Sequence, residues 1–286
     1  KVNTMNLVRM VYESDHDTKK YLALLRKRTI LCCKTLDVIR HIIQRNVEKG
    51  LLPNYCEGGI DITKQYSTIG ILGMYETLKE FGYVKIDEFG LASITDAGIE
   101  FAKSIFNVIN DVKDSFTEDY TFNIESVPAE RAAVILAQKD RILYNNKEPL
   151  YSNQWIPLSQ KTSIEEKLRT ASILDNLCSG GAIAHINIEK SFPSKDVAWD
   201  MLNEIALTGV IYFAFNTKIP VCKHNHAMAP GLTKCPICGE DVADFWTRIV
   251  GFYRPTSSFS AQRKIEYGSR QWWDYVDSLN ELAYSK

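Results

Sequence analysis

Apolar residues near the start of the chain recur at the spacing of an amphipathic helix. A strand-like opening at residues 2–7 comes first, and the acidic residues Asp15 and Asp17 then stand where a helix N-terminus favours them. The apolar positions that follow are Leu22, Leu25, Leu36, Ile39 and Ile43. We expect one long helix that buries this face and ends near Gly50 and Pro53.

Further along the chain, strand-like and helical segments alternate. Gly82 follows one helical segment, and Pro128 stands where the first turn of another helix tolerates it. Strands are expected at residues 66–73 (a strand or a loop), 120–124, 182–188 and 210–215. Helices are expected at residues 74–81, 95–112, 128–139, 164–177 and 196–208. This alternation, without an internal repeat, predicts an α/β fold with a largely parallel sheet.

Composition narrows the class of protein. With 286 residues, 45% hydrophobic and 24% charged, the chain is expected to be a soluble globular protein of one large or two modest domains. The chain has a net charge of −1, whereas a protein that binds a nucleic-acid backbone usually has an excess of basic residues. A primary role in binding DNA or RNA is therefore not expected. We recognise no secretory leader and no membrane span, which predicts a cytoplasmic protein. Because the sequence does not begin with methionine, we expect a fragment, a processed piece or one half of a split protein.

The seven cysteines do not resemble the disulfide framework of a secreted domain. The adjacent Cys32 and Cys33 fall in the middle of the long predicted helix, and we expect them to be small core residues. The remaining pattern favours reduced thiols and a metal.

Two short-spaced ligand pairs near the C-terminus predict a structural zinc site. Cys222 and His226 form the first pair, and Cys235 and Cys238 form the second, in a Cys-Pro-x-Cys-Gly sequence whose glycine lets backbone amides turn toward the sulfurs. His224 competes with His226, which we favour because a gap of three residues lets its ring face the metal. Four protein ligands leave no open position for catalysis. The alternative is a redox pair of Cys235 and Cys238, or thiols without a shared role.

An isolated glycine, Gly251, follows in the apolar stretch at residues 248–255. Taken alone, this stretch predicts a buried strand with a glycine at a bulge or a close approach. Its Arg-x-x-Gly-Phe sequence near the C-terminus resembles the signature of glycyl radical enzymes. Together with the Cys/His pairs upstream, it resembles the class III, or anaerobic, ribonucleotide reductases. The other segments that resemble this family are residues 3–9, 67–76, 179–188, 212–216 and the basic tail segment 263–270, so that the resemblance covers essentially the whole chain.

The resemblance implies a fold and an architecture. The fold class is α/β: the C-terminal half of a ten-stranded α/β barrel of the glycyl radical enzyme type, with a small C-terminal zinc-binding module. We expect four parts, which are half of the barrel at 1–216, the zinc knot at 217–246, the glycyl-radical loop at 247–262 and a tail at 263–286.

The implied activity is the anaerobic reduction of ribonucleotides to 2′-deoxyribonucleotides for DNA replication, with Gly251 as the catalytic residue that stores the radical. The cofactors would be zinc and the glycyl radical, which a separate radical-SAM activase installs with S-adenosylmethionine and its own iron–sulfur cluster. In the family, the radical passes to a cysteine in the barrel centre, which abstracts the 3′ hydrogen of the ribose.

Glycine suits this role physically. A radical at its Cα is delocalised over the flanking amide and carbonyl only if the centre can flatten, and a β-carbon would crowd that geometry. Glycine also permits unusual backbone angles and close packing. We expect the site to lie beside a barrel cavity, where Ile249, Val250 and Phe252 keep solvent and oxygen away.

The sequence departs from a complete enzyme of this family, because it matches neither the catalytic cysteines nor the N-terminal nucleotide-binding regulatory region. None of Cys32, Cys33, Cys56 and Cys178 stands at a position that matches the family's catalytic cysteines. The resemblance therefore implies a partner, an N-terminal portion of the reductase that carries them, besides the activase, the ribonucleotide and a second copy in a homodimer of the assembled enzyme. We expect neither nucleic acid nor a membrane as a partner.

A segment between a predicted strand and a predicted helix resembles the family's substrate loop. Its candidate substrate-binding residues are Glu125, Ser126, Val127, Ala129 and Glu130. A helix N-terminus there would place free N–H groups against substrate phosphates. The alternative is a plain helix cap, in which Ser126 and Glu130 serve local amides.

Weaker candidates and other functions stay open. His185 is a core or a functional histidine, Cys56 and Glu57 occupy a turn, and Trp272 and Trp273 are expected to anchor the tail by packing. The alternative functions are another glycyl radical enzyme of the pyruvate formate-lyase type and a catalytically inactive zinc-ribbon regulatory homologue.

Overall fold

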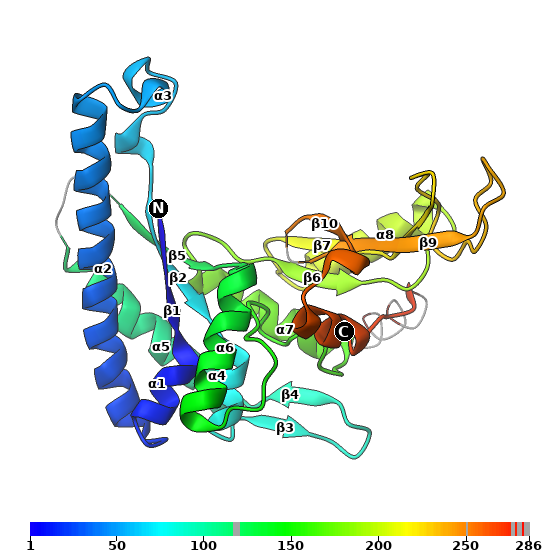
Figure 1. Cartoon of the computed structure of the whole chain (residues 1–286). Coiled ribbons are helices and arrows are strands. Elements are labelled where there is room, and N and C mark those ends of the chain that lie inside the picture. The colour runs from blue at the N-terminus through cyan, green and yellow to red at the C-terminus, as the bar shows by residue number, and fades with distance from the viewer. Residues whose placement is uncertain (117–120, 250, 276–277, 279–281, 283–286) are drawn as a thin grey trace. The chain divides into compact units, whose positions relative to one another are not determined.

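The computed structural model describes residues 1–116, 121–249, 251–275, 278 and 282 (Figure 1). The chain divides into two compact units, each built from several stretches of sequence. Unit 1 comprises Lys1–Tyr83, Thr95–Val127 and Asn176–Ala182. Unit 2 comprises Val84–Ile94, Pro128–Asp175 and Ile183–Lys286.

Unit 1 is built on a parallel three-stranded sheet. Its strands lie in the order β1 (Val2–Asn6), β2 (Ser67–Leu72) and β5 (Phe122–Ser126). All six residues of the central strand are buried, as expected for a parallel strand covered on both faces. Gly70 is required here, because a β-carbon on it would lie 2.7 Å from the Thr4 Oγ1 atom and 2.9 Å from the Val127 Cγ1 atom.

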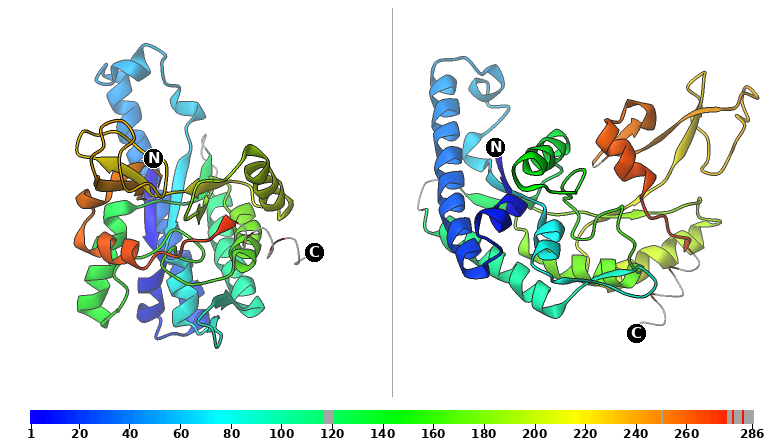
Figure 2. Two further views of the ribbon diagram at one scale, coloured as in Figure 1. Left: turned by 90° about the vertical axis from the view of Figure 1, so that its right-hand side faces the viewer. Right: turned by 60° about the horizontal axis from the view of Figure 1, so that its bottom comes forward.

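The helices of unit 1 begin where the sequence offers side-chain caps. Asp17 accepts a hydrogen bond from the Lys20 amide (2.8 Å), and Thr95 accepts one from the Gly98 amide (3.1 Å). The helices and the one 3₁₀ turn of this unit are α1 (Leu7–Glu13), α2 (Thr18–Glu48), α3 (Pro53–Cys56), η1 (Ile62–Lys64), α4 (Met74–Glu80) and α5 (Asp96–Asp114). Helices α2 and α5 pack against each other (Figure 2).

Unit 2 contains three small sheets among the described residues. Strands β6 (Ala184–Asn187) and β7 (Phe213–Asn216) are parallel. The antiparallel pairs are β3 (Val84–Ile86) with β4 (Ala92–Ile94), and β9 (Val242–Arg248) with both β8 (Ile219–Cys222) and β10 (Tyr253–Pro255). Its helices and one 3₁₀ turn are α6 (Glu130–Tyr144), α7 (Ile164–Leu174), α8 (Lys195–Leu207), η3 (Thr256–Ser258) and α9 (Ala261–Gly268), and a further 3₁₀ turn, η2 (Asp175–Leu177), follows α7.

The structure confirms a mixed α/β fold with parallel pairing in two of its sheets. The described residues form four separate sheets and no closed barrel, so the barrel stays a prediction. The strand expected at 210–215 begins only at Phe213, because Gly209, with φ +84°, ends the preceding helix in a turn. No helix within the described ranges is both long and apolar enough to cross a membrane.

Candidate functional site

Four predicted ligands come together beyond the end of β8. The ligand atoms of Cys222, His226, Cys235 and Cys238 all lie within 4.8 Å of one another. The Cys222 and Cys238 sulfurs are 3.7 Å apart, and the Cys235 sulfur is 3.5 Å from the His226 Nδ1 atom. The exposed His224 is not part of this cluster.

These distances fit one tetrahedral zinc ion. With Zn–S bonds of about 2.3 Å and a Zn–N bond of about 2.05 Å, a tetrahedron has S–S edges of about 3.8 Å and an S–N edge of about 3.6 Å. The observed S–S and S–N separations of 3.7 and 3.5 Å match these edges. Three cysteines and one histidine are also a common donor set of closed structural zinc sites.

Two tight turns bring the ligands together. In the first, the Cys222 amide donates to the His226 carbonyl (3.2 Å), which turns the histidine back toward the cysteine. In the second, the Gly239 amide donates to the Cys235 carbonyl (2.8 Å), and Gly239 has the left-handed φ of +75° that favours glycine. Desolvation raises the pKa of the Cys235 thiol, but hydrogen bonds from the backbone of Cys238 and Ile237 outweigh it and lower the pKa to about 6. A thiolate, the form that binds metal, is thereby favoured.

Gly251 lies on the hairpin turn between β9 and β10. Arg248 pairs with Tyr253 where the two strands end, and the Ile249 amide donates to the Phe252 carbonyl (3.1 Å). The guanidinium of Arg248 reaches over the turn and donates from Nη1 to the Gly251 carbonyl (2.8 Å). Hydrogen bonds therefore hold the Ile249 amide and the Gly251 carbonyl.

Three expectations about this glycine are wrong for the chain by itself. The segment is an exposed turn, not a buried strand. The exposed fraction of Phe252 is 51%, so Phe252 and the half-buried Ile249 do not shield Gly251 from solvent. Val250 lies outside the described residues. A β-carbon at position 251 would meet nothing within 4 Å, so there is no close approach in this chain that requires a glycine among the described residues.

The predicted substrate segment joins the end of β5 to the start of α6. Glu125 and Ser126 end the strand, Val127 is buried, and Ala129 is the N-cap of the helix whose first residue is Glu130. Ala129 offers no side-chain cap to this helix, and the alternative, in which Ser126 and Glu130 serve local amides, stays open. Burial raises the pKa of Glu125, partly offset by the nearby chain N-terminus.

A groove of about 430 Å³ in unit 2 lies between α6 and the segment that follows β9. It brings the predicted Glu130 together with Ile249 of the glycine-bearing turn and with the exposed Arg131 and Arg254. The other lining residues are Val134, Ile135, Gln138, Ser258, Ser260, Gln262 and Arg263. Two exposed guanidinium groups beside an uncapped helix N-terminus suit an anionic ligand.

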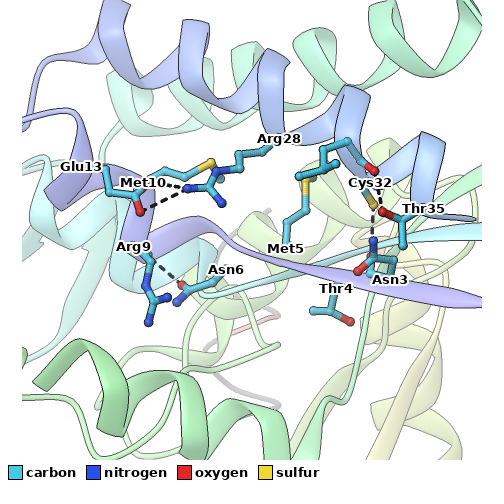
Figure 3. Close-up of a pocket in the computed structure, with 11 residues that line it drawn as sticks. Asn3, Thr4, Met5, Asn6, Arg9, Met10, Glu13, Arg28, Cys32 and Thr35 are labelled. Atoms are coloured by element: carbon cyan, nitrogen blue, oxygen red, sulfur yellow. Dashed lines mark hydrogen bonds and ion pairs between the residues drawn. The ribbon is translucent and has the colours of Figure 1, made fainter. Parts of the chain in front are cut away.

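A second hollow, of about 370 Å³, lies in unit 1 and contains none of the predicted site residues (Figure 3). It is lined by Asn3, Thr4, Met5, Asn6, Arg9, Met10, Glu13, Arg28, Leu31, Cys32 and Thr35. The Arg28–Glu13 ion pair (3.0 Å) spans one side, and the Cys32 thiol donates to the Asn3 carbonyl (3.5 Å). Burial raises the pKa of Cys32 to about 12 and that of Cys33 to about 11, so both behave as the predicted core residues.

Two of the weaker candidates, His185 and Trp273, are buried. His185 is 1% exposed on β6, and burial, with the positive charges of Lys167, Arg248 and Arg270 nearby, lowers its pKa to about 4. It is therefore a neutral histidine, which favours the core interpretation. Trp273 is buried, and its amide donates to a carbonyl of β6 (2.9 Å), which confirms the packing role.

Cys56 and Glu57 are exposed, and no described contact supports a catalytic role for either. The Cys56 thiol donates to the Val47 carbonyl (3.3 Å), and Glu57 ends the short helix α3.

Comparison with known proteins decides the family. The family model described as anaerobic ribonucleoside-triphosphate reductase matches residues 1–273. The chain belongs to this family. The match includes all four residues of the metal cluster and Gly251, and it confirms the resemblance that the motifs carried. This match does not support the alternative of a glycyl radical enzyme of the pyruvate formate-lyase type.

Solved structures of anaerobic ribonucleotide reductases are similar to the chain over nearly its whole length. One has a TM-score of 0.91 and 41% identity and covers 96% of this chain. The enzyme from Thermotoga maritima with glycerol in the active site has a TM-score of 0.87 and 41% identity over 93% of this chain. The same enzyme in complex with dATP and CTP has a TM-score of 0.86 and 40% identity, also over 93%. The comparison with curated proteins gave no match.

The chain spans less than half the length of these reductases, since it covers 45%, 44% and 44% of their chains. Sequence reasoning missed two residues beside the glycine-bearing turn, Glu266 and Arg270, which it treated as part of a basic tail. The available signal was an acidic and a basic residue four positions apart, at the end of a helical segment.

Proposed function

We propose that this chain is the part of an anaerobic ribonucleotide reductase that carries the radical glycine, Gly251, and part of the substrate site. The observation that carries the proposal is that a glycine stands where packing among the described residues does not require one. A radical at Cα supplies such a requirement, because the centre must flatten to share its unpaired electron with the flanking peptide groups.

The complete enzyme would reduce ribonucleotides to 2′-deoxyribonucleotides without oxygen. One similar structure is a complex with dATP and CTP, which supports nucleotides as ligands. In this chain, the uncapped N-terminus of α6 and the side chains of Arg131 and Arg254 would bind the substrate phosphates. Ala129 and Glu130 would belong to the same site, and Glu125, Ser126 and Val127 are proposed as further substrate-binding residues.

Cys222, His226, Cys235 and Cys238 would hold zinc as a closed structural brace. These residues, with zinc bound, would join the end of β8 to the residues just before β9, and β9 leads directly into the turn that carries Gly251. The chain's own residues do the remaining positioning, since Arg248 holds the carbonyl of Gly251 by a charged hydrogen bond.

The proposal includes parts that this chain lacks. A partner portion of the reductase would supply the catalytic cysteines, complete the barrel and cover the exposed Gly251, and the assembled enzyme would be a cytoplasmic homodimer. Residues 1–216 would form half of the barrel, 217–246 the zinc knot, 247–262 the radical loop and 263–286 the tail. A radical-SAM activase would install the radical.

Complementation tests this function. The chain is combined anaerobically with the polypeptide that carries the remaining portion, the activase, S-adenosylmethionine and a reductant. We expect formation of deoxyribonucleotide with the wild-type chain and none with Gly251→Ala, which the local space accommodates. Turnover that survives in Gly251→Ala would overturn the role of the glycine, and a wild-type chain that never supports turnover would favour an inactive regulatory homologue.

A further inference from the structure

A buried charged group lies directly beneath the glycine-bearing turn. The side chain of Arg270 is 0% exposed, and that of Glu266 is 7% exposed. Glu266 belongs to α9, which Ser260 caps by accepting from the Arg263 amide (3.2 Å), and Arg270 follows the helix. Burial of an ion pair costs free energy that a well-packed apolar pair would avoid, so this arrangement calls for a role other than packing.

The contacts of Arg270 point to that role. Its Nε and Nη2 atoms donate to the two carboxylate oxygens of Glu266 (2.8 and 3.1 Å). Its Nη1 atom donates to the Arg248 carbonyl (2.8 Å), and Nη2 donates also to the Ile249 carbonyl (3.3 Å). One rigid guanidinium thus holds two successive carbonyls at the entry to the turn, while the carboxylate fixes its plane.

We propose that Arg270, held by Glu266, is a positioning residue for Gly251. It fixes the backbone of Arg248 and Ile249, and the side chain of the fixed Arg248 in turn reaches the Gly251 carbonyl (2.8 Å). Because that carbonyl would share the unpaired electron, the clamp sets the orientation of the peptide group that stores the radical. The link from radical storage to the clamp rests on the proposed function, whereas the hold on the turn does not.

The same network offers a matched control. The Arg263 side chain is 8% exposed and donates from Nη1 to the Glu266 Oε2 atom (3.3 Å), but no hydrogen bond of the described residues joins it to the turn. Arg263→Gln therefore disturbs the buried charges and leaves the clamp in place. Arg270→Lys keeps the charge opposite Glu266 but cannot hold two carbonyls in one plane.

Hydrogen exchange of the full chain measures the hold on the turn. The amide of Ile249, which donates to the Phe252 carbonyl, is the reporter, and the amides of β6 serve as an internal reference. Loss of one or two hydrogen bonds should speed exchange at Ile249 about ten-fold in Arg270→Lys. We expect no change in Arg263→Gln, and unchanged exchange at Ile249 in Arg270→Lys would overturn the clamp.

Radical measurements on the assembled, activated enzyme complete the test. We expect Arg270→Lys to hold less glycyl radical and to lose it faster than wild type. A wild-type enzyme without any radical would overturn the proposed function. In that case the hydrogen-exchange result alone would test whether Arg270 holds the turn. A normal radical yield and lifetime in Arg270→Lys would overturn the positioning role and leave the proposed function standing.

Discussion

Removal of the metal should unfold the segment between Cys222 and Cys238, because little else in that segment holds it. Its buried hydrophobic residues are only Cys222, Met228 and Cys235, with Cys238 and Val242 packed at the edge. The perturbation we choose is Cys235→Ser, which replaces a buried sulfur ligand by a poor one.

The expected magnitude follows from the size of the segment. Ordering its 17 residues costs about 17 kcal/mol at about 1 kcal/mol each. Burial of Met228 offsets about 3 kcal/mol of this cost. A structural zinc site contributes about 10–16 kcal/mol, which closes the difference. The segment should therefore be ordered with zinc and unfolded without it.

Trypsin reports this change directly. Lys223 and Lys234 are exposed and lie inside or beside the turns that the ligands close. We expect one zinc ion per wild-type chain, slow cleavage at both lysines, and fast cleavage after chelation or in Cys235→Ser. Cys56→Ser, which removes an exposed cysteine remote in sequence, is the matched control. A wild-type chain without zinc, or a cleavage pattern that chelation leaves unchanged, would refute the reasoning.

Two further predictions concern glycine and pH. Gly70→Ala should destabilise the chain by about 1–3 kcal/mol, because its β-carbon would clash with Thr4 and Val127, whereas Gly251→Ala should shift the free energy of unfolding by less than about 1 kcal/mol. Urea unfolding of both variants checks this, and equal losses would contradict it. Burial raises the pKa of Asp175 from 3.8 to about 6, despite the hydrogen bond from Trp155. The folded chain therefore binds the proton of the Asp175 carboxyl more tightly than the unfolded chain does. The contribution of Asp175 to the free energy of unfolding should be full below about pH 4 and should be lost as the pH rises through about 6. Asp175→Asn should flatten that dependence in urea titrations across this range, and an unchanged slope would contradict the assignment.

Local signals in the sequence predicted much of the fold. Asp17 caps the long helix and Gly82 follows the end of α4, as expected, because both effects act within one helical turn. The β3–β4 hairpin escaped prediction, since each strand has three residues, too few for a period of two to be recognised. Helix α1 was missed because Asn6, read as part of a strand, is its N-cap.

The four candidate zinc ligands could be predicted from local sequence, because they lie in two tight turns and the residue spacing within each turn fixes the geometry. The exposure of Gly251 could not be predicted from the sequence, because the burial of a residue depends on elements distant in sequence that pack against it. The contacts of Arg270 with Arg248 and Ile249 join residues 22 and 21 positions apart, and they depend on how α9 packs beneath the turn. No pattern within the sequence carries such a contact.

Electron paramagnetic resonance of the activated protein tests the central claim most directly. The chain is assembled with its partner portion and treated anaerobically with the activase and S-adenosylmethionine. We predict a doublet from the single hydrogen left on the Gly251 Cα, collapse of the doublet to a singlet when the protein's glycines are deuterated at Cα, and no signal from Gly251→Ala with unchanged zinc content. A doublet that persists in Gly251→Ala, or its absence from a wild-type assembly that reduces ribonucleotides, would contradict the account.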